Sequence, residues 1–235
     1  MQPAAAPGPA PATLPMPRLS GLAVFFYVFL PFALGHYLSS LLRNVNAVLA
    51  SNLVGSLALT PGQLGLLTSA FFFAFALVQL PVGIALDRHG PRRVQLSMLL
   101  LASFGALLFA RGEGFMQLLL ARAVMGCGLG GCFMAAVKAV STWIAPNRLP
   151  SVHGYLIAVG GMGAASATMP VRAALEYTDW RGLFLLLAAL VACTGLLIAL
   201  LVPKSDGPAA SRGPLLPALR EVWRAPSFRS VVSLV

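Results

Sequence analysis

The sequence Gly83-Ile84-Ala85-Leu86-Asp87-Arg88-His89-Gly90-Pro91-Arg92-Arg93 lies between two long uncharged runs. Residues 44–86 contain no charged side chain, and residues 94–110 contain none either. Because a hydrocarbon core of about 30 Å needs roughly 20 apolar helical residues, both flanks are long enough to span a bilayer. The stretch itself places three arginines beside one aspartate. By the positive-inside rule, a turn with this charge belongs in the cytoplasm.

The composition indicates an all-α integral membrane protein. The chain is 58% hydrophobic and 9% charged, with a mean hydropathy of +0.86, whereas an average soluble domain is about 25% charged. A net charge of +10 is also found in proteins that bind nucleic acid. Most basic residues sit in short segments between apolar spans, as membrane topology predicts, so nucleic acid is not expected as a partner. The three cysteines lie within apolar runs, which argues against a disulfide framework.

The apolar runs predict a six-helix bundle over residues 19–202. Its spans are expected at about 19–53, where Pro31 interrupts the run, and then at 63–86, 94–110, 115–140, 154–171 and 183–202. Residues 1–18 form a Pro/Ala-rich tail that is too poor in large apolar groups to order itself. Residues 203–229 are predicted to form a cytoplasmic loop, and residues 230–235 resemble the beginning of a seventh, incomplete span.

The basic residues orient the predicted bundle. Those on one side outnumber those on the other, and the excess predicts a cytoplasmic N-terminus in a bacterial inner (plasma) membrane. The richer side holds Arg18, Arg88, Arg92, Arg93, Arg148, Lys204 and Arg212, and the opposite side holds Arg111, Arg172 and Arg181.

Four motifs resemble those of the major facilitator superfamily. They are the G-x-x-x-D-R-x-G-x-R-R turn that starts at Gly83, R-x-x-x-G-x-G from Arg122 to Gly128, W-R-x-x-F from Trp180 to Phe184, and Arg43-Asn44-Val45-Asn46. The last is similar to the D-R-x-N segment of the anion:cation symporter branch, although Leu42 stands where that branch usually has an acid. The resemblance implies the N-terminal six-helix half of a twelve-helix carrier. Such a carrier works by alternating access against a C-terminal six-helix half, without a cofactor and without enzymatic activity.

The resemblance also implies a role for the charged turn. In the family this turn is a cytoplasmic latch between the two halves, which assigns gating to Gly83, Asp87 and Arg88, with Gly90, Arg92 and Arg93 completing the motif. Asp87 is suited to lie near the positive N-terminal end of a neighbouring helix. Gly90 supplies backbone freedom for a reversal that Pro91 then fixes. The alternative is an ordinary solvated turn that obeys the positive-inside rule.

Glycines inside the spans are expected to serve helix packing. Residues 126–131 formally match the dinucleotide fingerprint G-x-G-x-x-G, but they lie in an apolar span rather than after a strand. Small residues let helices approach closely in a membrane. Packing contacts are therefore predicted at Gly126, Gly128 and Gly130, and in the fifth span at Gly160, Gly161, Gly163, Ala164 and Ala165.

Polar residues inside the spans are the candidate substrate contacts: Arg43, Asn44, Asn46 and Arg122. For a regular helix, Arg43 lies roughly 25 Å from the outer turn at Thr60, near the middle of the bilayer. An arginine at that depth costs at least about 2.5–3.5 kcal/mol, so it should face a wet cavity or a partner. Either it binds a substrate carboxylate or phosphate, or it pairs with an acid of the missing half. Arg122 is expected to be structural or gating. Lys138 is expected to reach the membrane surface, with a substrate contact as the alternative.

The absence of acids favours an anionic small-molecule substrate. No Asp or Glu lies within the predicted spans, whereas proton-coupled drug antiporters often use one there. His36 is a candidate proton site or a packed histidine. The alternatives are a proton-coupled drug or metabolite exporter, a non-transporting sensor and a degenerate half-carrier. No H-E-x-x-H or G-x-S-x-G motif supports an enzyme, and no metal site is expected.

Overall fold

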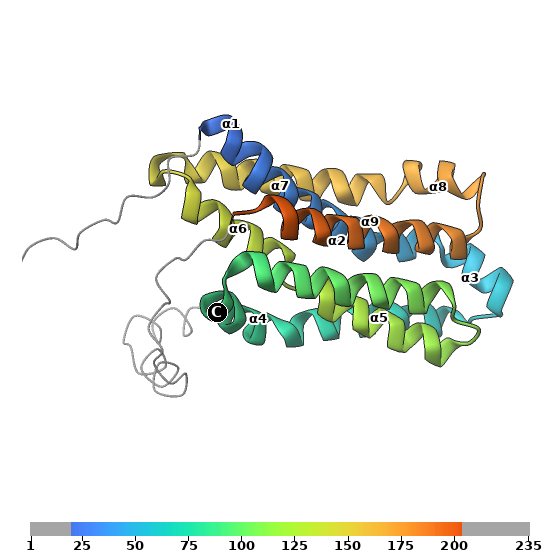
Figure 1. Cartoon of the computed structure of the whole chain (residues 1–235). Coiled ribbons are helices and arrows are strands. Elements are labelled where there is room, and N and C mark those ends of the chain that lie inside the picture. Colours follow the sequence, from blue (N-terminus) through green and yellow to red (C-terminus); the bar gives the residue numbers. More distant parts are fainter. Residues whose placement is uncertain (1–19, 204–235) are drawn as a thin grey trace, which may run out of the picture.

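The structure, a computed structural model, describes residues 20–203. These residues form an all-helical bundle whose long axes run parallel or antiparallel to one another (Figure 1). The predicted tail at residues 1–18, the loop after residue 203 and the segment 230–235 lie outside the described residues.

The first apolar run forms one continuous helical path with a widened turn near its start. It comprises α1 (Gly21–Val24), the π-helical turn η1 (Phe25–Phe29), α2 (Leu30–Val48) and α3 (Ala50–Leu57). Pro31 lacks an N–H and its ring would clash with the carbonyl of Tyr27 in a regular helix. A wider π turn relieves such a clash. The helical path therefore passes Pro31 and ends at Leu57, four residues beyond the predicted end.

The opening stretch forms a sharp reversal inside the segment α4 (Pro61–Ala110). Gly90 has φ 75° and ψ 162°, which a residue with a side chain rarely adopts. The two limbs, residues 61–89 and 91–110, run in opposite directions along the bundle (Figure 1). Thr60 and Gln63 form a capping box at the first limb. Pro91 begins the second limb, where its missing N–H costs nothing.

The remaining spans are α5 (Phe115–Leu129) with α6 (Cys132–Trp143), α7 (Leu149–Ser166) with α8 (Met169–Leu175), and α9 (Trp180–Leu201), with a 3₁₀ turn, η2, at Pro146–Arg148. The predicted fourth span is thus two helices that meet at Gly130 and Gly131. The fifth begins at Leu149 rather than 154, because Pro150 occupies its first turn, and it breaks before Pro170.

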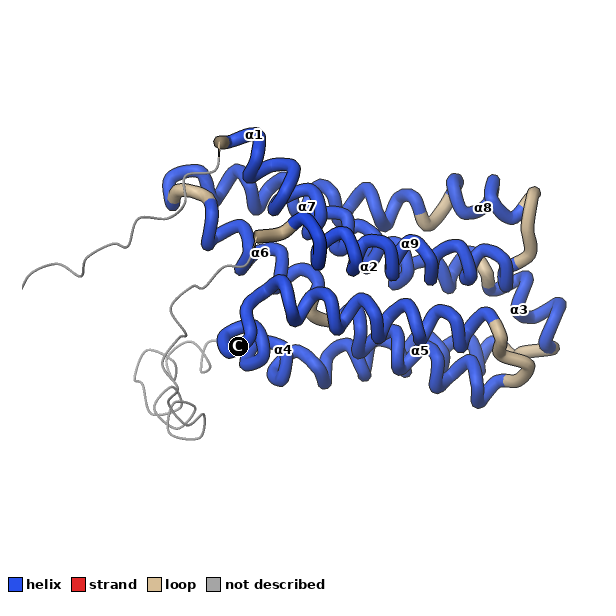
Figure 2. The backbone as a smooth tube through the Cα atoms, viewed as in Figure 1, coloured by secondary structure: helices blue, strands red, loops and turns tan. Residues whose placement is uncertain are grey.

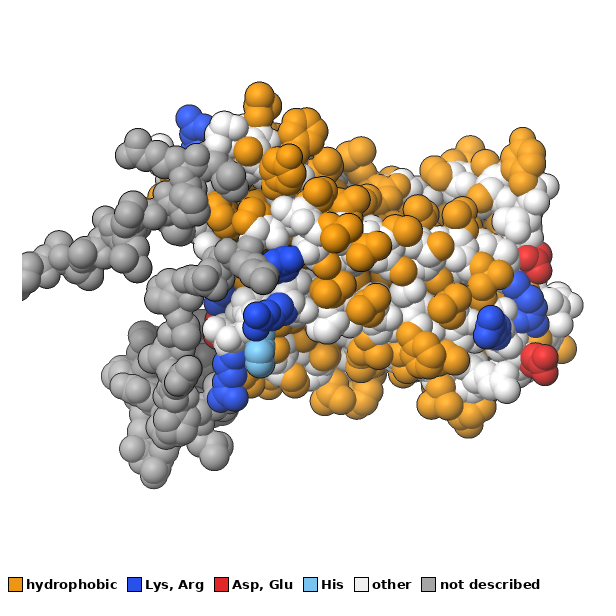
Figure 3. All heavy atoms as spheres, in the orientation of Figure 1, with side chains coloured by type: hydrophobic (Ala, Val, Ile, Leu, Met, Phe, Trp, Pro, Cys, Tyr) orange, Lys and Arg blue, Asp and Glu red, His pale blue; other side chains and the backbone are white. Residues whose placement is uncertain are grey.

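The bundle presents an apolar surface (Figure 3). Five helical stretches of residues 20–203 are long and apolar enough to cross a membrane, and α4 contains two of the six spans. Large apolar side chains point outward along these helices, including Phe73 (72% exposed) and Leu80 (76% exposed). Most connections lie at the two ends of the bundle, and short non-helical breaks occur within it between α5 and α6 and between α7 and α8 (Figure 2). The all-α, six-helix membrane fold predicted from the sequence is confirmed.

Glycines bring the helices into direct contact. A Cβ built on Gly128 would lie 2.4 Å from the backbone nitrogen of Ala102, and one on Gly126 would lie 2.3 Å from the carbonyl oxygen of Phe71. Both contacts join α5 to a limb of α4. Built on Gly163, a Cβ would lie 2.3 Å from the carbonyl oxygen of Tyr37, where α7 meets α2. Gly130 and Gly160 pack equally tightly against the side chains of Val78 and His36.

We predict that Gly128→Ala destabilises the bundle, because a methyl group there collides with backbone that cannot rotate away. Overpacking of this kind costs about 1–3 kcal/mol. The melting temperature of the native protein in detergent should fall. The packing contact predicted at Gly161 is wrong, because a Cβ added there would have no atom within 4 Å. Gly161→Ala is therefore the matched control, and alanine favours the helix there. Equal melting temperatures for the two variants would contradict the packing role.

Candidate functional site

Arg43 is half-buried on α2. One of its guanidinium nitrogens donates to Ser40 Oγ at 3.3 Å, and its Cζ lies 5.9 Å from the centre of the Phe75 ring. It lies fourteen residues before Leu57, roughly 21 Å along a regular helix. Within residues 20–203 it forms no ion pair. A half-buried guanidinium that forms one hydrogen bond keeps donors free for an anion.

The two asparagines near Arg43 have different surroundings. Asn44 is exposed and donates to the carbonyl of Ser40 at 2.7 Å, so its amide nitrogen is bound to its own helix. Asn46 is buried and donates to Thr68 Oγ1 at 2.9 Å, toward the first limb of α4. Asn44 therefore accompanies Arg43 at an accessible face, whereas Asn46 joins helices inside the bundle.

Arg122 is fully buried on α5. It donates to the carbonyl of Leu42 at 3.2 Å, and its Cζ lies 4.7 Å from the centre of the Phe71 ring. Its Nε and second terminal nitrogen have no hydrogen-bond partner in the described part of the chain. Arg122 thus links α5 to both α2 and α4. Its carbonyl acceptor belongs to the residue before Arg43, so it positions that segment of α2 rather than facing an open cavity.

The charged turn is held by contacts that the sequence alone did not predict. Asp87 is exposed and forms an ion pair with Lys138 of α6. Arg92 donates to the carbonyl of Ala199 on α9. Lys138 was expected to reach the membrane surface, but it binds the aspartate of the motif. The topology could have predicted this ion pair, because the first α4 limb and α6 both end at the same end of the bundle.

The other turn residues leave a free surface among the described residues. A Cβ on Gly83 would meet no atom within 4 Å. Arg88 and Arg93 are exposed. The neighbouring helix that would approach Gly83 and Asp87 in a latch is not part of residues 20–203.

His36 lies inside the helix packing. Its Nε2 faces Gly160 of α7, and its ring centre is 5.0 Å from that of Phe133. Its Nδ1 is buried without a hydrogen-bond partner among the described residues. No group of three or more His, Cys, Asp or Glu side chains that could hold a metal ion occurs within residues 20–203.

Comparison with known sequences identifies the family. The profile of the Major Facilitator Superfamily matches residues 22–235. The chain therefore belongs to the Major Facilitator Superfamily, a class of membrane transporters rather than enzymes. The family prediction made from the charged turn and the accompanying motifs is confirmed.

Curated relatives agree with this assignment. A probable sulfoacetate transporter of Cupriavidus necator is 28% identical over 65% of this chain and 36% of its own length. A probable L-galactonate transporter of Escherichia coli is 32% identical over 57% of this chain and 30% of its own. A hexuronate transporter of Bacillus subtilis is 26% identical over 71% of this chain and 38% of its own. The chain thus spans about a third of the length of these relatives.

A solved structure shows the same fold. It is a bacterial homologue of the human lysosomal transporter Spinster, in an inward-facing and unoccupied conformation. The TM-score is 0.64 at 21% identity, over 87% of this chain and 50% of that chain. The described bundle therefore has the fold of about half of that transporter chain.

We predict that Arg122→Met changes the unfolding free energy by less than about 1.5 kcal/mol, because a buried cation with unpaired nitrogens repays little of its desolvation cost. Arg122→Ala should instead cost about 2–5 kcal/mol, since it leaves a cavity between α2, α4 and α5. Unfolding of the native protein in mixed detergent micelles measures both. A methionine variant as unstable as the alanine variant would show that the hydrogen bond to Leu42 and the Phe71 contact are strongly stabilising.

Proposed function

We propose that this transporter moves a small organic anion and that Arg43 recognises its negative charge. The observation that carries the proposal is the half-buried guanidinium of Arg43, which forms no ion pair within the described residues. A guanidinium binds a carboxylate through two parallel N–H···O bonds, and such charge-assisted bonds are about twice as strong as neutral ones. Asn44 lies beside it with its amide oxygen still free to accept from a substrate hydroxyl.

The distribution of acids supports an anionic substrate. The acidic residues of the described part of the chain are Asp87, Glu113, Glu176 and Asp179, and all four lie at helix ends. A cationic drug would therefore be repelled by Arg43, and no carboxylate within these helices would bind its charge. The named substrates of the relatives, sulfoacetate, galactonate and hexuronate, are likewise organic anions.

We predict that Arg43→Gln raises the half-saturation concentration for anion exchange at least about tenfold, because it removes a charge-assisted hydrogen bond. The measurement is counterflow of labelled galactonate and of sulfoacetate in proteoliposomes that contain the native protein. Arg111→Gln is the matched control, since Arg111 is exposed in the turn after α4.

Either of two results would contradict the proposal. One is an Arg43→Gln variant that exchanges both anions as well as the wild type. The other is exchange of an uncharged sugar of similar size in preference to either anion. Binding without flux would instead favour a sensor or a degenerate half-carrier, and a proton-coupled drug exporter would move cationic dyes rather than anions.

The charges also support an orientation. Among residues 20–203, the end that carries the Gly90 turn holds Arg88, Arg92, Arg93, Lys138 and Arg148 with the single acid Asp87. At the opposite end, the basic residues Arg111, Arg172 and Arg181 are balanced by Glu113, Glu176 and Asp179. The positive-inside rule places the Gly90 end, and with it the N-terminus, in the cytoplasm of a bacterial inner membrane.

We predict that single cysteines report this orientation. In a cysteine-free background, Asn147→Cys should resist an impermeant maleimide in spheroplasts and react in inverted vesicles, because Asn147 lies at the Gly90 end. Arg111→Cys should show the opposite pattern. Both positions are exposed, so the side of the membrane on which each cysteine lies decides whether it reacts with the maleimide. Labelling of Asn147→Cys in intact spheroplasts would reverse the proposed topology.

A further inference from the structure

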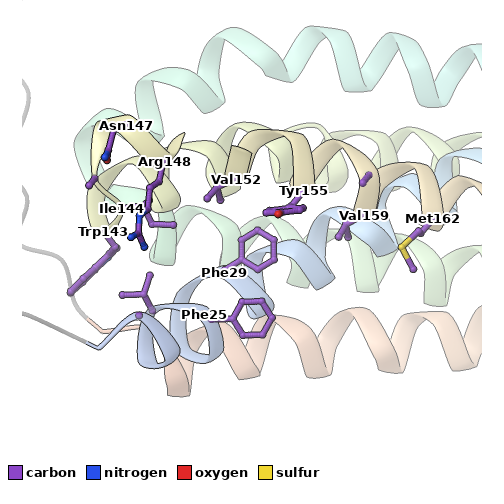
Figure 4. A pocket seen from close by; sticks show the side chains of 14 residues that line it. Phe25, Phe29, Trp143, Ile144, Asn147, Arg148, Val152, Tyr155, Val159 and Met162 are labelled. Atoms are coloured by element: carbon purple, nitrogen blue, oxygen red, sulfur yellow. The ribbon is translucent and has the colours of Figure 1, made fainter. Parts of the chain in front are cut away.

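A groove of about 820 Å³ opens on the side of the bundle at the Gly90 end (Figure 4). It lies between α1 and η1 on one side and the N-terminal part of α7 on the other. Its floor and walls are apolar: Phe25 and Phe29 point into it from η1, opposite Val152, Val159 and Met162 along α7. A volume of this size is in the range of small-molecule sites. None of its lining residues belongs to the Arg43 region or to the charged turn.

One end of the groove is cationic. Arg148 follows the turn after α6, and its guanidinium lies beside Ile144 at the loop end of the groove (Figure 4). Arg148 is exposed and forms no ion pair within residues 20–203. None of the described residues that line the groove is acidic. The site therefore joins a positively charged head to an apolar body.

The length of the groove matches one leaflet of a bilayer. From Arg148 to Met162 a regular helix rises about 21 Å. With its headgroup region, one leaflet is roughly 20–22 Å thick, so a headgroup at Arg148 would allow an acyl chain to lie along α7 as far as Met162. Tyr155 and Met162, each 64% exposed, form the outer lip of the groove. Exposed apolar side chains at these two positions offer contact area to an acyl chain.

We propose that this groove binds one anionic phospholipid, with the phosphate at Arg148 and an acyl chain between η1 and α7. Charge complementarity supports this occupant: basic pockets between transmembrane helices on the cytoplasmic side bind anionic headgroups. A zwitterionic lipid gains less from Arg148, because its ammonium group offsets the phosphate. A helix of the absent carrier half would match the charge of the groove only if it placed an acidic side chain beside Arg148. The proposal is independent of the transported substrate.

The test is native mass spectrometry of the native protein in detergent, titrated with phosphatidylglycerol or with phosphatidylcholine of the same acyl chains. Wild type should bind one phosphatidylglycerol more tightly than phosphatidylcholine. Arg148→Gln should weaken phosphatidylglycerol binding about fivefold, the usual effect of one basic residue near an anionic surface. Arg172→Gln is the matched control, since Arg172 is exposed on α8 at the opposite end.

Two further arms test the acyl chain and the source of the phosphate. Met162→Glu places a charge where the chain should lie and should weaken binding of phosphatidylglycerol. Met162 is exposed, so this change is compatible with folding, which the melting temperature checks. Glycerol phosphate at millimolar concentration should leave the lipid bound.

Four results would overturn the proposal: unchanged phosphatidylglycerol binding in Arg148→Gln, unchanged binding in Met162→Glu, equal binding of phosphatidylcholine by the wild type, and displacement by glycerol phosphate. The last would mean that the site takes a free anion. Insensitivity to both substitutions would mean that another part of the protein covers the groove.

Discussion

The arrangement of the bundle depends on the approach of α5 to both limbs of α4. Lipid tails are as apolar as leucine, so helices in a membrane associate through close packing rather than through the hydrophobic effect. Gly126 meets the carbonyl of Phe71 on the first limb, and Gly128 meets the backbone of Ala102 on the second. Gly105 of α4 likewise packs closely against α5, because a Cβ there would lie 2.7 Å from the backbone nitrogen of Met125. These contacts leave no room for a side chain, and they set the position of everything else on α5.

The burial of Arg122 follows from this packing. Arg122 precedes Gly126 by one helical turn on α5. The close packing of α5 against α4 at Gly126 therefore also buries the guanidinium of Arg122 in the core. There it meets the Phe71 ring and the carbonyl of Leu42. Because Leu42 adjoins Arg43, the buried arginine links the packing of α5 to the placement of the accessible one. The two arginines thus differ in their surroundings: Arg122 is fully buried inside the bundle, and Arg43 is half-buried.

The charged turn illustrates the difference between an interaction that stabilises and one that positions. Lys138 and Asp87 are partly exposed, and exposed ion pairs contribute about 0–1 kcal/mol. The pair therefore adds little to stability. Its effect is geometric: it holds the end of the first α4 limb against α6. On the other side, the hydrogen bond from Arg92 to the carbonyl of Ala199 holds the turn against α9, and Gly90 adopts the positive φ that the reversal needs.

The sequence by itself determined the class, the number of spans and the family. Uncharged runs of bilayer length leave a chain no alternative to helices in hydrocarbon, since each backbone polar group must be satisfied within its own segment. It also indicated several of the glycines that pack, because small residues have that use inside a span, but it missed Gly105 and wrongly included Gly161. It did not predict the π turn before Pro31 or the break at Gly130, which arise from local clashes and neighbouring helices. Only the tertiary structure joined Arg122 to the carbonyl of Leu42, turned Asn46 inward and paired Lys138 with Asp87. Those outcomes depend on which helices are neighbours, and residues 22 to 80 positions apart in the chain carry no local sign of their contact.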